Sequence, residues 1–96
     1  QECPSIAINN HWMTSLKLNE VNKKFNIENL INHFAKNEIQ VRPMWYLCHL
    51  QKPYIKKESF LIENAIDLQK KVLNIPCSTN ITEAELDKVC SVILNF

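Results

Sequence analysis

The stretch that decides the fold is residues 12–42, which read WMTSLKLNEVNKKFNIENLINHFAKNEIQVR. Its first seven residues, 12–18, alternate between apolar and polar side chains, which predicts a strand with one buried face. We expect that face to consist of Trp12, Thr14, Leu16 and Leu18. Apolar residues then recur at helical spacing over 27–34, behind Asn26 as a helix cap, and the helix should end near Asn37. These residues therefore predict a strand followed by a helix.

A second strand is predicted directly after this helix. Ile39 and Val41 alternate with polar neighbours, which places Arg42 on the polar face. Proline cannot donate a hydrogen bond to a strand ladder, so Pro43 is expected to stop the strand. Residues 43–58 show no clear period, and a connection of this length is usually functional or disordered.

The C-terminal half predicts two further helices and one short strand. The second helix is marked by Leu61, Ala65, Leu68 and Val72. A strand over 72–75 follows and is halted by Pro76. Thr82 and Glu85 form a capping box before the third helix. The apolar face of that helix is expected to hold Leu86, Val89, Cys90 and Ile93.

This order of elements predicts an α+β fold. We expect a small antiparallel sheet of about three strands with three helices packed on it, in a single domain over 1–96.

Size and charge exclude several functional classes. The chain has 96 residues, 22% of them charged, and a formal net charge of +1, which is not the basic balance of a nucleic-acid-binding protein. No apolar run approaches the roughly 20 residues that span a bilayer. Residues 1–20 also lack a signal-peptide pattern. We therefore expect a cytoplasmic protein that binds neither nucleic acid nor a membrane.

The spacing of the four cysteines bears on redox and metal chemistry. They stand far apart, at Cys3, Cys48, Cys77 and Cys90, with no CxxC pair. We expect reduced thiols, with Cys90 packed as a small hydrophobe. A metal site built from Cys48, His49 and Cys77 is disfavoured by the same spacings. His33 is expected at the solvent edge of its helix.

Glycine is absent from the chain, whereas asparagine occurs twelve times. Without glycine there is no glycine-rich phosphate loop and no dinucleotide fingerprint. Asparagine is the other residue that tolerates left-handed backbone, so Asn37 and Asn95 are expected to end helices.

Two local patterns carry residue types suited to binding. Residues 9–12 read NNHW, and residues 42–49 read RPMWYLCH. The guanidinium of Arg42 offers a fixed fork of donors for a carboxylate or phosphate, and His49 can donate or accept a hydrogen bond near neutral pH. The alternative is structural: Arg42 pairs with a nearby acid, while Trp45 and Tyr46 cover the edge of the core.

These patterns resemble those of a known family. Residues 42–49 are similar to the Arg-Pro-x-Trp-x-Pro-x-His signature of the DegT/DnrJ/EryC1/StrS sugar aminotransferases. Residues 10–12 resemble the Asn-Tyr/His-Trp that opens the small domain in this family. Residues 75–78 resemble its Leu/Ile-Pro-Ser-Gly/Ser, and residues 80–93 resemble its closing helix. The four blocks occur in the family's order and cover nearly the whole chain.

Three positions depart from the family pattern. Leu47 stands where many members have a second proline, Tyr46 where a lysine is usual, and Cys77 where serine is common. In having leucine at position 47, the sequence resembles the family branch that acts on nucleotide-linked amino-sugar precursors of the bacillosamine and legionaminic acid type.

The resemblance implies a C-terminal small domain of a fold-type I aminotransferase that uses pyridoxal phosphate. Such enzymes move an amino group, usually from glutamate, to a keto-sugar on a nucleotide, and the parent enzyme is expected to be a homodimer. The large domain would hold the cofactor and its lysine, so we assign no catalytic residue, metal or bound cofactor to this chain. The substrate-binding candidates are Asn10, Arg42, Trp45 and His49.

Two other classes remain open at this point. Because the chain starts at Gln1, we expect a piece of a longer enzyme whose large domain packs on this one and which is inactive alone. The main alternative is a stand-alone, non-catalytic α+β binding module. A small metal-dependent protein is the third reading.

Overall fold

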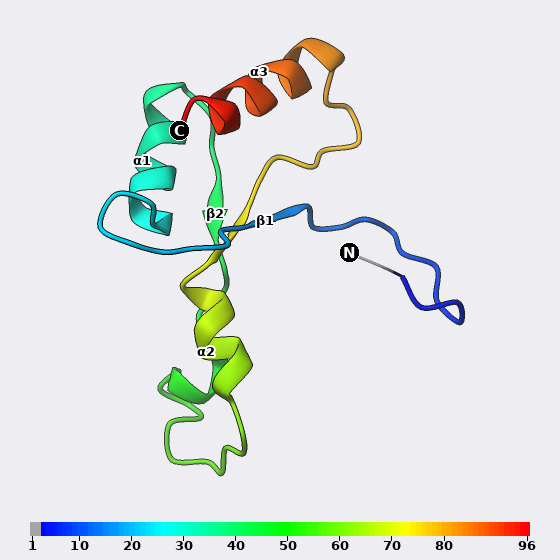
Figure 1. Ribbon diagram of the computed structural model, residues 1–96. Coiled ribbons are helices and arrows are strands. Elements are labelled where there is room, and N and C mark those ends of the chain that lie inside the picture. Colours follow the sequence, from blue (N-terminus) through cyan, green and yellow to red (C-terminus); the bar gives the residue numbers. More distant parts are fainter. Residues whose placement is uncertain (1–2) are drawn as a thin grey trace.

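The computed structural model describes residues 3–96 as a small sheet with helices above and below it (Figure 1). In chain order the elements are β1 (Ser15–Lys17), α1 (Ile27–Lys36), β2 (Arg42–Pro43), the 3-10 helix η1 (Cys48–Leu50), α2 (Glu63–Gln69), β3 (Val72–Asn74) and α3 (Glu83–Leu94). The predicted α+β class and the predicted order of helices and strands are confirmed.

The sheet has the strand order β1-β3-β2, and both pairings are antiparallel. Leu16 lies opposite Leu73, and Pro43 lies opposite Leu73 on the other side. All three residues of β3 are buried, as expected for the central strand. The middle strand of the sheet is thus the last of the three in the sequence.

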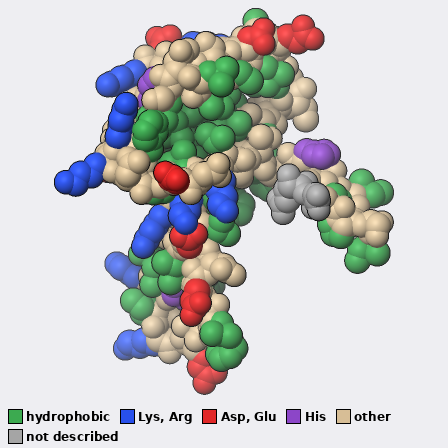
Figure 2. All heavy atoms as spheres, in the orientation of Figure 1, with side chains coloured by type: hydrophobic (Ala, Val, Ile, Leu, Met, Phe, Trp, Pro, Cys, Tyr) green, Lys and Arg blue, Asp and Glu red, His purple; other side chains and the backbone are tan. Residues whose placement is uncertain are grey.

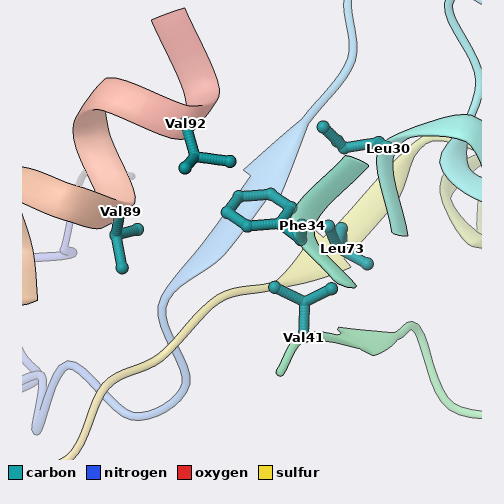
Figure 3. Packing of buried hydrophobic residues seen from close by; sticks show 6 residues of the cluster. All are labelled: Leu30, Phe34, Val41, Leu73, Val89 and Val92. Atoms are coloured by element: carbon teal, nitrogen blue, oxygen red, sulfur yellow. The ribbon is translucent and has the colours of Figure 1, made fainter. Parts of the chain in front are cut away.

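The core forms where α1 and α3 meet the sheet. The side chain of Phe34 lies at its centre, between residues of both helices and of the sheet region (Figure 3). The buried cluster consists of Leu30, Phe34, Val41, Leu73, Val89 and Val92. Helix α2 contributes no buried residue and lies at the opposite end of the sheet from α1 and α3 in Figure 1.

Helix α1 begins and ends as its sequence predicts. The side chain of Asn26 accepts a hydrogen bond from the backbone of Asn29, which satisfies one of the free N–H groups of the first turn. Asn37 is the C-cap, and Asn95 caps the end of α3. Asn37 is not itself left-handed, because its φ is −98°; the positive φ of 59° falls on Glu38.

His33 links the two core helices. Its Nε2 lies 3.0 Å from the carbonyl oxygen of Val92 in α3, and its ring packs against Phe96 with centroids 5.4 Å apart. His33 is half-buried, so the expected position at the solvent edge is only partly correct.

The capping box at the start of α3 is confirmed. The Oγ1 of Thr82 accepts a hydrogen bond from the backbone of Glu85, and a carboxylate oxygen of Glu85 accepts one from the backbone of Thr82 at 2.8 Å. The backbone hydrogen bond from Thr82, together with the one from its hydroxyl, lowers the pKa of Glu85 from its ordinary value of 4.5.

This lowered pKa gives a prediction for Glu85→Gln. Because the folded state favours the carboxylate, its contribution is fully present above the unfolded pKa and is lost as the pH falls through the lower folded pKa. The wild type should be more stable than the variant at about pH 6, and the difference should narrow towards about pH 3. Urea unfolding followed by circular dichroism measures it, and a difference that widens in acid would contradict the assignment.

The predicted ends of the first two strands were wrong, because packing between distant segments determines where these strands begin and end. The first strand shortens to three residues, so Leu16 and Leu18 pack on the core while Trp12 and Thr14 are exposed. The second strand moves to Arg42–Pro43; Pro43 pairs at the sheet edge and does not stop the strand before itself.

Two helical predictions also need correction. Helix α2 covers only Glu63–Gln69; Leu61 precedes it, and Val72 belongs to β3. In α3 the buried residues are Val89 and Val92, whereas Leu86 and Cys90 are exposed. Cys90 is therefore not packed as a small hydrophobe, although all four cysteines are free thiols as expected.

The molecule is open in shape. Its radius of gyration is 15.7 Å, against about 12–13 Å for a compact domain of this length. Figure 1 shows an N-terminal arm and the lobe around η1 and α2 extending away from the body formed by α1 and α3. Among the helices of residues 3–96, none combines the length and apolarity needed to cross a membrane.

Candidate functional site

The structure brings the two sequence patterns together through their tryptophans. The rings of Trp12 and Trp45 lie with centroids 6.5 Å apart and planes tilted by 55°, which is a favourable aromatic contact. Both remain on the surface, with 64% and 66% of their areas exposed. A pair of large aromatic side chains that covers no core is available to contact a ligand or another protein surface.

Asn10 shapes the backbone that presents Trp12. Its Oδ1 accepts a hydrogen bond from the backbone N–H of Trp12 at 3.1 Å, and Asn9 makes the same kind of bond to His11 at 2.7 Å. These are Asx turns, and His11 takes the positive φ of 56° between them. Asn10 thus holds the ring of Trp12 near Trp45 through the backbone.

Two glutamines hold the segment that carries Trp45. The Nε2 of Gln69, at the end of α2, donates to the carbonyl of Trp45 at 3.4 Å, and the Nε2 of Gln51 donates to the carbonyl of Tyr46 at 3.0 Å. Sequence analysis did not identify either glutamine, because each bond joins residues whose proximity depends on the fold.

Arg42 starts β2 and lies opposite Asn74 in the sheet. Its side chain is exposed, and within residues 3–96 the one ion pair joins Lys71 and Asp67, so Arg42 has no acidic partner there. Trp45 and Tyr46 are also mostly exposed. Among residues 3–96, the structure therefore does not show the structural alternative, in which Arg42 pairs with an acid and the aromatics cover the core edge.

His49 lies in a different place from Arg42. It belongs to η1, is half-buried, and lines a cavity of about 490 Å³ together with Tyr54, Lys57 and Ile62. Arg42 does not line this cavity. The structure thus brings Asn10 and Trp45 together through Trp12, while Arg42 and His49 flank the same segment, 43–48, at its two ends.

Asn74 is a polar residue that sequence analysis missed. It is 6% exposed, and its Oδ1 accepts a hydrogen bond from the hydroxyl of Ser15 at 2.7 Å. The available signal was a polar side chain inside the apolar run 72–75. A buried amide in the middle strand is unusual and calls for a structural or binding role.

No group of three histidine, cysteine or acidic side chains suited to a metal ion occurs in the part of the chain from Cys3 onward. Cys48 and His49 are neighbours in η1, but Cys77 lies beyond β3. This arrangement gives no support to the hypothesis of a small metal-dependent protein.

Comparison with known proteins gives the family. The model of the DegT/DnrJ/EryC1/StrS aminotransferase family matches residues 3–94. This chain belongs to that family. The match includes both aromatic patterns, the arginine and histidine at the ends of 42–49, and the whole of α3.

A curated relative of this aminotransferase family agrees with the match. EpsN of Bacillus subtilis (strain 168), which carries the name of a pyridoxal phosphate-dependent aminotransferase, is 27% identical over 94 residues. The alignment covers 94% of this chain and 24% of EpsN, so the chain spans about a quarter of that relative's length. No solved structure matches the chain.

The lysines of the chain are the residues to which pyridoxal phosphate could attach. Such a lysine must be shielded from water so that its amine is neutral and reactive. Nine of the ten lysines are exposed, and the half-buried Lys71 forms an ion pair of 2.7 Å with Asp67. The residues of this chain therefore do not fit the cofactor by themselves.

Proposed function

We propose that this chain is the C-terminal small domain of a pyridoxal phosphate-dependent aminotransferase that transfers an amino group from glutamate to a keto-sugar carried on a nucleotide. The observation that carries the proposal is the family match over 3–94, which includes the binding-type residues of 9–12 and 42–49. The leucine at position 47 favours a substrate of the bacillosamine or legionaminic acid type.

The shape of the molecule supports its role as one part of a larger enzyme. Figure 2 shows hydrophobic side chains on the surface of the arm, the lobe and the body. Exposed examples are Ile8, Phe60 and Leu94. Surfaces of this kind mark contacts with other protein. A large domain of the same chain, and a second subunit of a homodimer, would cover them in a cytoplasmic enzyme.

The cofactor and the proton-transferring lysine would then belong to that large domain, which supplies the carbanion-stabilising chemistry. The residues of this chain would bind and orient the substrate. Arg42 offers two parallel donors to an anionic group. Trp45 offers a stacking face beside Trp12, and His49 offers a ring nitrogen from the lining of its cavity.

The test uses the complete enzyme with purified Arg42→Ala and His49→Ala variants. Loss of charge-assisted hydrogen bonds to the substrate should lower kcat/KM for the keto-sugar nucleotide by about tenfold to hundredfold for Arg42→Ala. The effect of His49→Ala should be about tenfold. Lys52→Ala, a change at an exposed residue three positions after His49, is the matched control and should change kcat/KM by less than about twofold.

Unchanged kinetics in both variants would remove Arg42 and His49 from the substrate site. Absence of any glutamate-dependent amino transfer by the complete protein would instead favour the non-catalytic binding module.

A further inference from the structure

The three strands place one polar side chain each in a row across the sheet. Asn74 of the middle strand lies directly opposite Ser15 in β1 and directly opposite Arg42 in β2. Residues that pair directly across strands have Cβ atoms about 5 Å apart and project from the same face. Leu73, the neighbour of Asn74, projects into the core, so the row lies on the opposite face.

The row has donors that the protein does not use. Ser15 donates to the Oδ1 of Asn74, which fixes the amide and directs its Nδ2 donors away from Ser15. Within residues 3–96 the Nδ2 of Asn74 has no hydrogen-bond partner, although the residue is 6% exposed. The guanidinium of Arg42 is likewise without an acidic partner there.

The charge around the row favours an anion. The three strands read SLK, RP and VLN, so they contain two cations, Lys17 and Arg42, and no acidic side chain. Ser15 also lines a hollow of about 280 Å³ next to Trp12, which leaves room for the rest of a ligand. Arg42 and Asn74 stand at paired positions of adjacent strands, so that a guanidinium and an amide on the same face could together donate to a carboxylate or phosphate.

We propose that Arg42 and Asn74 form an oxyanion-binding site on this face of the sheet, with Ser15 as the residue that orients the amide. The ligand group is a carboxylate or a phosphate. The inference rests on the proposed function for its biological meaning, since an amino donor supplies the first group and a nucleotide the second. It adds Asn74 and Ser15 to the residues that recognise the substrate.

The experiment is a binding titration of the 96-residue chain followed by nitrogen-15 NMR, with inorganic phosphate in one arm and glutamate in the other. The side-chain amide signals of Asn74 and the Nε–H signal of Arg42 should shift together and saturate in at least one arm. Saturation with phosphate alone identifies a phosphate site, and saturation with glutamate alone identifies a carboxylate site. No saturable shift of these signals in either arm overturns the proposal.

Asn74→Asp is the decisive variant, because it keeps the acceptor for Ser15 and replaces the donors by a negative charge. The dissociation constant of the anion, measured from the Nε–H signal of Arg42, should rise at least about tenfold. Asn80→Asp makes the same charge change on the exposed loop before α3. Its dissociation constant for the anion should stay within about twofold of the wild-type value. Equal effects of the two variants would contradict a specific site.

Three further variants test the site without changing the buried residue Asn74. Arg42→Gln alters an exposed residue and should also weaken binding about tenfold. Ser15→Ala should weaken it less, and Ser15→Thr, which retains the hydroxyl, should restore it. Because binding is measured without turnover, a negative result here leaves the proposed aminotransferase function standing, and an inactive complete enzyme leaves the anion site standing.

Discussion

Replacing Phe34 by alanine is expected to leave the chain largely unfolded at room temperature. The side chain of Phe34 is fully buried and lies among residues of α1, α3 and the sheet region (Figure 3). Loss of such a ring costs about 3–5 kcal/mol through lost burial and the cavity left behind. Natural domains have a total stability of about 5–15 kcal/mol, and small ones lie near the lower end.

The measurement is urea unfolding followed by far-ultraviolet circular dichroism. Phe60→Ala provides a matched control, since it removes the same ring from a site that is 85% exposed. The control should change the free energy of unfolding by less than about 0.5 kcal/mol. If Phe34→Ala unfolded at the same urea concentration as Phe60→Ala, the assignment of the core to α1, α3 and the sheet would be wrong.

The second large effect is expected when the chain is assayed without the rest of the enzyme. We expect no amino transfer from glutamate by the 96-residue chain, whereas the complete enzyme should turn over. The physical reason is the state of its lysines, which are solvated or, for Lys71, held in an ion pair with Asp67. None of them lies in an enclosed pocket of the kind that activates a nucleophilic lysine.

The assay follows conversion of glutamate to its keto acid with a keto-sugar nucleotide as acceptor. The chain and the complete enzyme are compared at equal concentration with added pyridoxal phosphate. Turnover by the chain alone above the rate of free cofactor would contradict this prediction.

Local sequence signals predicted the parts of the fold that depend on neighbouring residues. Asn26 and the pair Thr82 and Glu85 act within one turn of the backbone, so the starts of α1 and α3 could be predicted from sequence. The order of strands and helices followed from the same local periods.

The remaining features depend on contacts between distant residues. The apolar face of α3 turned out to centre on Val89 and Val92 because Phe34 and Leu30 of α1 lie there. Leu86 and Cys90 match the helical period equally well but find no core in this chain. Period alone cannot choose between two apolar stripes on one helix.

The candidate site shows the same division. The types of residue in 42–49 predicted a binding segment, and the family resemblance predicted its substrate; both stay predictions. Neither showed that Trp12 would contact Trp45, or that Asn74 would stand between Ser15 and Arg42, because strand register joins residues far apart in the chain.

The central claim, that this chain is the substrate-binding small domain of an enzyme whose cofactor site lies elsewhere, is tested most directly by a pyridoxal phosphate titration. The visible absorbance of the cofactor is followed as it is added to the chain and, separately, to the complete enzyme. We predict a saturable one-to-one spectral change with the complete enzyme and none with the chain. A saturable one-to-one change with the chain alone would contradict the account.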